Sequence, residues 1–146
     1  MTYTENKKAY FNYEILEKFE GGLELQGQEV KSIKSGKASI AGAYAAIRGG
    51  ELYLLGSQIP PYQQNNIKEG YDPERTRKIL VKKEDINYFI GKLQTERLTL
   101  IPLKLYNKGN LVKIELGLGK SKKKEDKREA IKKRETDREI LRKLKT

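Results

Sequence analysis

The residues best suited to chemistry in this chain are its lysines and arginines. Most of their excess over aspartate and glutamate lies at the C-terminal end. The last 28 residues, Gly119 to Thr146, hold thirteen Lys or Arg against six Asp or Glu, so +7 of the net charge of +11 lies there. A cationic segment with few apolar residues stays solvated until it meets a polyanion. We therefore expect RNA or DNA as the partner.

Further cations follow a polar, loop-like stretch over residues 56–77. Arg75, Arg77 and Lys78 lie close to Tyr71 in the chain. Cations bind phosphate, and a neighbouring ring can stack on an exposed base. The alternative is a charged loop over the mouth of the fold, and binding is the preferred interpretation.

Two more candidate groups lie in the first quarter of the chain. Glu29, Lys31 and Lys34 share a short helical stretch. Glu29 could accept hydrogen bonds from guanine or a 2′-hydroxyl, or it could favour the first helical turn through the helix dipole. Asn6 and Lys7 belong to a flexible-looking start, where they could contact RNA or cap the fold.

Several kinds of chemistry have no residues to support them. The chain has no His and no Cys, which removes the commonest general base, thiol catalysis and most zinc sites. Its four Asp are scattered, whereas a two-metal nuclease needs carboxylates that converge on two ions. Gly117-Leu118-Gly119-Lys120-Ser121 lacks the first glycine of a phosphate loop. We expect a binding protein without catalysis, cofactor or metal, and keep a metal-dependent nuclease as an alternative.

The sequence also predicts where the protein works. No apolar run reaches 18 residues, so no membrane span is expected. The start lacks the apolar core of a secretory signal. We therefore expect a cytoplasmic protein.

Short strands joined by tight turns dominate residues 1–118. Residues 13–19 alternate as a strand that Gly21-Gly22 should break, and a helix over 28–34 should end at Gly36. Gly49-Gly50 joins two extended runs as a type I′ hairpin turn does. A helix is expected over 82–97, with an apolar stripe of Ile86, Phe89, Ile90 and Leu93.

A second hairpin follows that helix. Residues 98–105 and 111–118 alternate, which predicts one buried face, and Pro102 should lie at an edge or a bulge. Tyr44 and Tyr106 are expected in the core. The whole pattern predicts a mainly β fold, a small antiparallel OB-like barrel with two or three packed helices; a half-open sandwich is the alternative.

The basic segment over residues 119–146 is expected to behave as a separate tail. Its residues are good helix formers, but Ile140, Leu141 and Leu144 form an apolar stripe only one turn long. Such a stripe does not offset ordering of the backbone, at ~1–2 kcal/mol per residue. We predict a nascent or absent helix in the free protein that becomes ordered on binding; a merely solubilising tail is the alternative.

The chain resembles a known family, the SsrA-binding proteins (also called small protein B), which are partners of transfer-messenger RNA. The resemblance covers nearly the whole chain and depends on the order and spacing of several stretches. They are Asn6-Lys7-Lys8-Ala9, Tyr13 to Phe19 leading into Glu20-Gly21-Gly22-Leu23-Glu24-Leu25-Gln26-Gly27-Gln28-Glu29-Val30-Lys31-Ser32, Gly36-Lys37, Ile59-Pro60-Pro61-Tyr62, Asn66, Asp72-Pro73-Glu74-Arg75-Thr76-Arg77-Lys78-Ile79-Leu80, Ile101-Pro102-Leu103-Lys104-Leu105-Tyr106 and Asp126-Lys127-Arg128.

The resemblance implies an OB-like body that holds the elbow of a tRNA-like domain. It implies a tail that enters the small-subunit decoding centre and the empty mRNA path of the ribosome as a helix. We expect the protein to be a monomer. The RNA-binding residues would be Asn6, Lys7, Glu29, Lys31, Lys34, Arg75, Arg77 and Lys78. The ribosome-binding residues would be Lys120, Lys122, Lys123, Lys124, Asp126, Lys127, Arg128, Lys132, Lys133 and Arg134.

Two tail residues depart from the family pattern. Ser121 stands where a glycine is usual, which puts a hinge with positive φ in doubt. Glu125 stands where the family has a ring that could stack on a base. The competing hypothesis is a ribosomal or general OB-type RNA-binding protein without specificity for transfer-messenger RNA.

Overall fold

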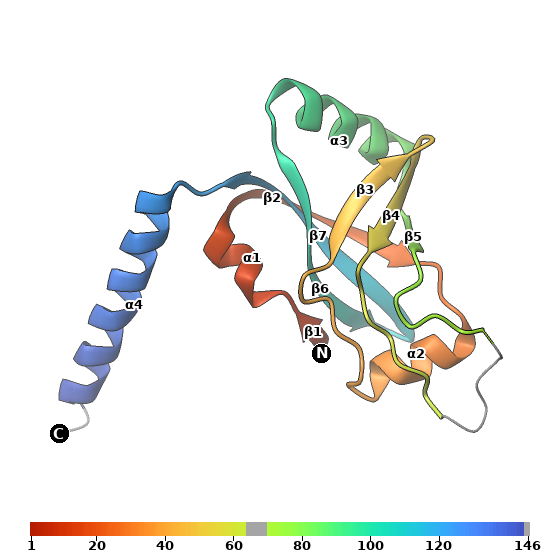
Figure 1. Ribbon diagram of the computed structural model, residues 1–146, viewed down its shortest axis with the longest axis horizontal. Coiled ribbons are helices and arrows are strands. Elements are labelled where there is room, and N and C mark those ends of the chain that lie inside the picture. The colour runs from red at the N-terminus through yellow and green to blue at the C-terminus, as the bar shows by residue number, and fades with distance from the viewer. Residues whose placement is uncertain (64–69, 145–146) are drawn as a thin grey trace.

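The computed structural model describes residues 1–63 and 70–144. Its fold is built on one antiparallel sheet of seven strands (Figure 1). Across the sheet the strands run in the order β1-β6-β7-β2-β5-β4-β3. In chain order the elements are β1 (Thr2–Glu5), α1 (Lys7–Asn12), β2 (Tyr13–Leu23), α2 (Gly27–Lys34), β3 (Tyr44–Arg48), β4 (Glu51–Leu55), β5 (Arg77–Leu80), α3 (Lys83–Thr95), β6 (Thr99–Lys108), β7 (Leu111–Ser121) and α4 (Lys124–Leu144).

The sheet coils into the OB-like barrel that the alternating pattern predicts. Edge strand β1 pairs with residues 104–106 of β6, and the other edge strand, β3, approaches β6 without a ladder between them. The barrel therefore has an open seam between β3 and β6. Buried aliphatic side chains fill its interior, including Leu52, Leu54, Ile79, Leu105 and Ile114.

Helix α3 lies across one end of the barrel (Figure 1). Its predicted apolar stripe faces the core, where Phe89 is fully buried and meets Phe19 of β2 edge-on, with 4.8 Å between ring centroids. The helix ends at Thr95, and Arg97 then adopts a left-handed φ of 53°, a conformation that helix ends often use.

A second, smaller core lies on the outer face of the sheet, beneath α1. A bulge between Pro102 and Lys104 of β6 makes the strand change faces, so Leu100 and Leu105 point into the barrel while Ile101 and Leu103 point outwards to Ala9 of α1. Pro102 lies at a bulge as predicted. The expectation of one buried face was wrong for this strand, because α1 covers the other face.

Strand β2 passes through the two glycines that were expected to break it. Gly21 and Gly22 both pair within the sheet, with β7 and, at Gly22, also with β5. A Cβ atom at Gly21 would lie 3.0 Å from methyl groups of both Ile79 and Val81. The glycine therefore permits close approach of neighbouring side chains, which the sequence alone could not distinguish from a turn.

The first hairpin and the short helix agree with prediction. Gly49 and Gly50 both have positive φ, 58° and 77°, as a type I′ turn between β3 and β4 requires. Helix α2 begins with a capping box, in which the side chain of Gln26 accepts from the N3 amide and the Glu29 carboxylate accepts from the Gln26 amide.

The start of the chain is ordered, contrary to expectation. Four residues form β1, and six form α1. Asn6 joins the two elements to the barrel, because its amide donates to the Leu103 carbonyl at 2.8 Å and its side chain donates to the Pro102 carbonyl at 3.2 Å. Long-range contacts stabilise this segment rather than a local pattern.

Strand β7 extends to Ser121, three residues beyond the expected division at 118/119. Ser121 pairs with Tyr13 and lies in the strand, so it forms no hinge of positive φ. The 21-residue helix α4 then leaves the barrel beside α1 (Figure 1). That this helix is nascent or absent in the free protein until it binds stays a prediction.

Candidate nucleic-acid interface

The buried carboxylate of Glu29, in α2, binds residues of the segment between β4 and β5. Glu29 is fully buried and its Oε2 accepts from Arg77 Nη2 at 2.6 Å, Arg77 Nε at 2.8 Å and Arg75 Nε at 3.1 Å. The Tyr71 hydroxyl donates to the same oxygen at 3.1 Å. Burial alone would raise the pKa of Glu29, but the hydrogen bonds from Arg75, the Gln26 amide and Arg77 outweigh it and hold the pKa below its usual value.

The guanidinium of Arg77 also connects separate turns of this loop. It is fully buried and donates to Ser57 Oγ at 3.1 Å, the Pro73 carbonyl at 3.1 Å and the Arg75 carbonyl at 2.9 Å. Two guanidinium groups share one carboxylate, which leaves a local surplus of one positive charge. Since Arg77 is enclosed, this surplus reaches solvent through Arg75, whose side chain is 29% exposed.

The predicted residues of the loop and α2 thus divide into buried and exposed groups. Glu29 and Arg77 are enclosed, so in this conformation neither carboxylate nor guanidinium faces a ligand. Lys78 faces outwards from the adjacent position of β5, 3.4 Å from Glu51. Lys31 and Lys34 are exposed on α2, and Lys34 donates to the Asn110 carbonyl at 3.3 Å.

Sequence reasoning missed Lys37 as a member of this surface. Its Nζ lies 5.4 Å from the centroid of the Tyr62 ring and donates to the Tyr62 carbonyl at 3.0 Å. Tyr62 and Lys31 line a hollow of about 260 Å³ beside α2. We call Lys31, Lys34, Lys37, Tyr62 and Arg75 the α2 surface. The signal available in the sequence was the short spacing of Lys31, Lys34 and Lys37.

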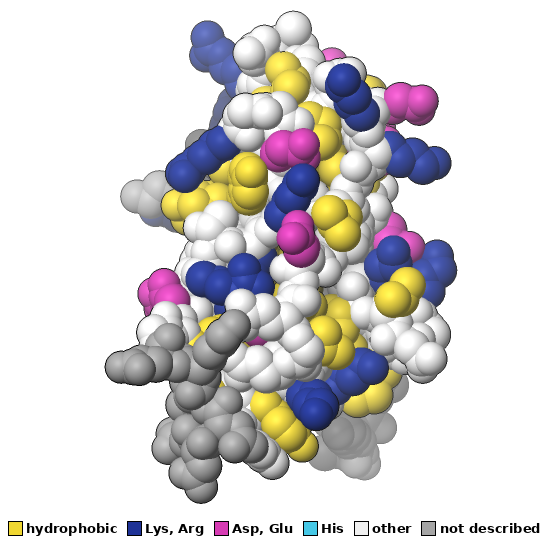
Figure 2. All heavy atoms as spheres, turned by 90° about the vertical axis from the view of Figure 1, so that its right-hand side faces the viewer, with side chains coloured by type: hydrophobic (Ala, Val, Ile, Leu, Met, Phe, Trp, Pro, Cys, Tyr) yellow, Lys and Arg dark blue, Asp and Glu magenta, His cyan; other side chains and the backbone are white. Residues whose placement is uncertain are grey.

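Basic side chains do not merge into one continuous patch on the side of the molecule shown in Figure 2, where acidic and apolar groups lie between them. Residues 64–69 of the predicted binding loop lie outside the described residues. Charge alone therefore does not define the extent of the interface on this side.

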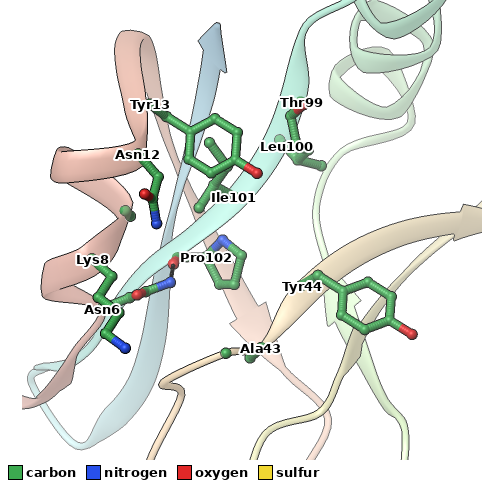
Figure 3. Close-up of a pocket in the computed structure, with 12 residues that line it drawn as sticks. Asn6, Lys8, Asn12, Tyr13, Ala43, Tyr44, Thr99, Leu100, Ile101 and Pro102 are labelled. Carbon is green, nitrogen blue, oxygen red and sulfur yellow. Dashed lines mark hydrogen bonds between the residues drawn. The ribbon is translucent and has the colours of Figure 1, made fainter. Parts of the chain in front are cut away.

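The other predicted RNA-binding pair, Asn6 and Lys7, lies at α1, away from α2 (Figure 1). Asn6 is 8% exposed and holds α1 to β6, whereas Lys7 is exposed. Beside them, a pocket of about 270 Å³ opens at the seam between β3 and β6. Figure 3 shows Tyr13 and Tyr44 on opposite sides of this opening.

The two tyrosines expected in the core are only partly enclosed. Tyr44 is 54% exposed, because β3 is an edge strand beside the open seam. Tyr106 is half-buried, and its hydroxyl donates to the Glu20 carboxylate. Burial and that hydrogen bond raise the pKa of Tyr106.

The predicted tail residues lie in three settings. Lys120 is in β7 opposite Glu14. Lys122 is bound to α1, where its amide donates to the Asn12 carbonyl at 2.9 Å and its Nζ donates to the Tyr10 carbonyl at 3.0 Å. Exposed residues of α4 include Arg128, Lys132, Lys133 and Arg134. The side chains of Lys124, Asp126 and Lys127 lie outside the described ones, as does that of Glu125.

In the part of the chain that the structure describes, no three acidic side chains gather as a metal ion would require. Within the same residues, no helix is both long and apolar enough to cross a membrane.

Comparison with known proteins decides the family. A family model described as SmpB protein matches residues 3–146. An SsrA-binding protein of Mesoplasma florum is 51% identical over 140 residues, which cover 96% of this chain and 94% of the relative. One of Synechocystis sp. is 46% identical over 142 residues, which cover 97% and 92%.

The chain belongs to the SmpB family.

A solved structure described as "tmRNA-SmpB: a journey to the center of the bacterial ribosome" supports this assignment. Its SmpB-family chain is 41% identical to this one, with a TM-score of 0.66, and the match covers 87% of this chain and 92% of that chain. The resemblance read from the sequence is therefore confirmed. The family model also includes α4, so the tail is part of the SmpB-family pattern and not an unrelated extension.

Proposed function

We propose that this SmpB-family protein binds the tRNA-like domain of transfer-messenger RNA and brings it to stalled ribosomes for trans-translation. The observation that carries the proposal is the match of body and tail together to proteins named for binding SsrA and to a chain described with transfer-messenger RNA in the bacterial ribosome. Cationic surfaces on both parts of the chain fit an RNA partner. The protein would act by binding alone, as a monomer in the cytoplasm.

Folded RNA would contact the body at the α2 surface. Lys31, Lys34 and Arg75 present donors for phosphate, and the Tyr62 ring could stack on an unpaired base. Lys78 lies at the margin of this surface and would add a phosphate contact. Glu29 and Arg77 would serve RNA binding indirectly, because their ion pair fixes the loop that carries Arg75.

Residues of the N-terminal segment and the tail would complete the interaction. Lys7 would contact RNA from α1, and Asn6 would fix the orientation of α1 on the barrel. The tail, from Lys120 onwards, would enter the decoding centre and the empty mRNA path as a helix. Lys120 and Lys122 would hold the start of the tail on the body, and the cations of α4 would meet ribosomal RNA.

The test is to sequence the RNA that co-purifies with the full chain from its own cell. Strong enrichment of transfer-messenger RNA over total RNA is expected. Recovery of ribosomal RNA in stoichiometric amount, with no enrichment of transfer-messenger RNA, would instead support a ribosomal or general OB-type RNA-binding protein. A matched preparation of the Lys31→Gln, Lys34→Gln double variant should lose most of the enrichment.

A further inference from the structure

Helices α1 and α4 enclose a groove at the junction of body and tail. Strands β2 and β7 pair as far as Tyr13 and Ser121, so the chain enters the sheet from α1 and leaves it towards α4 at the same place. The two bonds from Lys122 to the carbonyls at the end of α1 then hold the start of α4 beside it. Figure 1 shows the two helices next to each other.

Positive charge exceeds negative charge among the described residues that line this groove. Its volume is about 1050 Å³, and Lys7 and Lys8 of α1 line it together with Arg134 and Arg138 of α4. Glu5 is the one acidic residue among the described lining residues. Among the side chains that the structure describes, no ion pair joins α1 to α4. Four cations face one another beside a single carboxylate, and the excess of like charge means that the groove favours an anionic occupant.

Aromatic rings accompany the cations. Phe11 and Tyr10 line the groove, and the guanidinium of Arg134 lies 5.8 Å from the centroid of the Phe11 ring. Tyr10 is exposed, and its backbone carbonyl accepts a hydrogen bond from Lys122 Nζ. A cationic channel with rings is the combination that binds single-stranded nucleic acid, since unpaired bases stack on the rings while phosphates meet the cations.

We propose that the groove between α1 and α4 binds a single-stranded segment of RNA. Lys7, Lys8, Arg134 and Arg138 would contact successive phosphates, and an unpaired base would stack on Phe11. A duplex fits this chemistry poorly, because its bases are already stacked on one another. The inference rests on the proposed function for the choice of RNA as polyanion, but it assigns a site separate from the α2 surface.

Occupation of the groove also affects the tail. Phosphates between the two helices cancel the repulsion between their cations, so RNA bound here holds α4 against α1. Without RNA the same repulsion favours separation of α4 from the body. The groove would therefore link the direction of the tail to the presence of an unpaired RNA segment.

The test measures binding of a labelled single-stranded RNA of about ten nucleotides to the full chain by fluorescence anisotropy. Arg138→Gln is compared with Arg142→Gln, which removes the same charge one turn further along α4, outside the groove lining. Arg138→Gln should weaken binding about fivefold and lower the salt-dependence slope by about one. Arg142→Gln should stay within about twofold of the unchanged protein.

Phe11→Leu tests stacking, since it keeps an apolar side chain and removes the ring. It should weaken binding of the single strand about tenfold. Equal losses for Arg138→Gln and Arg142→Gln would overturn the proposal, as would an unaltered affinity for Phe11→Leu or equal affinity for a duplex of the same length.

Binding of a tRNA-like RNA fragment to the same proteins separates the two proposals. If the unchanged protein binds that fragment but not the single strand, the groove proposal fails alone. If it binds the single strand in the groove but prefers no tRNA-like fragment over an unrelated hairpin, the proposed function fails and the groove survives.

Discussion

Glu29 illustrates how a residue can shape a binding surface from beneath it. Its carboxylate joins α2 to the loop before β5 through Arg75, Arg77 and Tyr71. Removal of one partner from a buried ion pair leaves an uncompensated charge, which costs far more than loss of an exposed pair. The stability of the loop therefore depends on the enclosed members, and ligand contact depends on the exposed ones.

Arg77→Met should lower the free energy of unfolding by about 3–5 kcal/mol, since it leaves part of the buried Glu29 charge unpaired. Lys78→Met is the matched control, because Lys78 occupies the next position of β5 and is partly exposed. The control should change stability by about 0.5 kcal/mol or less. Urea unfolding followed by circular dichroism measures both, and equal effects would contradict the assigned role of the pair.

The lowered pKa of Glu29 predicts a pH dependence. Its ionised form is stabilised in the folded state, so its contribution is complete above its unfolded pKa and is lost as pH falls through the lower folded pKa. Urea unfolding of the unchanged protein and of Glu29→Gln should therefore show a stability difference that shrinks below about pH 4. A difference that stays constant down to about pH 2.5 would refute the coupling.

The sequence could place these residues near one another only in part. Chain position groups Arg75, Arg77 and Lys78, but neighbouring residues of a strand face opposite sides, and only the start of β5 determines that Arg77 points inwards. Its partner Glu29 is 48 residues away. No local pattern specifies a contact over that separation.

At the scale of elements, the predictable parts are those with a local signal. The Gly49-Gly50 turn, the α3 stripe and the β7 alternation all follow from short-range patterns. Strand β1 and helix α1 have no such signal, because four and six residues are too few for a periodicity and their stability comes from β6. The burial of both faces of β6 could not be predicted, because a bulge shifts the alternation of its side chains by one residue.

Gly21 and Gly22 allow a direct test of packing in β2. Gly21→Ala should destabilise the protein by about 1–3 kcal/mol, because the new methyl group would press on two β-branched side chains that adjust poorly. Gly22→Ala places its methyl group at an ordinary 3.6 Å from Leu80 and should be neutral or slightly stabilising. Thermal unfolding of both variants checks this, and a reversed order would show that β2 relaxes at Gly21.

Helix α4 should open easily in the free protein. Ile131 and Ile140 are 43% and 51% exposed, and the main described contact of α4 with the body is its contact with α1. Elements with few buried contacts open at little cost. Hydrogen exchange in dilute buffer should therefore be fast over residues 128–142 and slow in β6 and β7. Strong protection throughout α4 would show that the tail is ordered before it binds.

At the scale of the whole molecule, strand β7 continues past the expected division between body and tail at 118/119. Residues 119–121 pair with β2, and Gly119 packs so closely that a Cβ atom there would lie 3.0 Å from Ile101. A cut before Gly119 would therefore damage the barrel, whereas a cut after Lys123 leaves β7 and the Lys122 bonds intact.

A chain that ends at Lys123 should bind a tRNA-like RNA fragment within about threefold of the full chain, since the α2 surface remains intact. It should fail to support release of stalled ribosomes in a reconstituted translation assay. A chain that ends at residue 118 is the comparison and should unfold more easily. Loss of fragment affinity by tenfold or more in the 123-residue chain would show that the tail shares in holding the folded RNA.

Because Lys122 is bound to the end of α1, the position of α1 determines the direction in which α4 leaves the body. A helix of 21 residues is about 30 Å long, so a rotation of about 10° at its base moves the far end by about 5 Å. That displacement is one helical pitch, enough to shift every basic side chain near the tip to a different phosphate. Substitutions in α1 that disturb this attachment would then point α4 in the wrong direction, although every residue of α4 itself is unchanged.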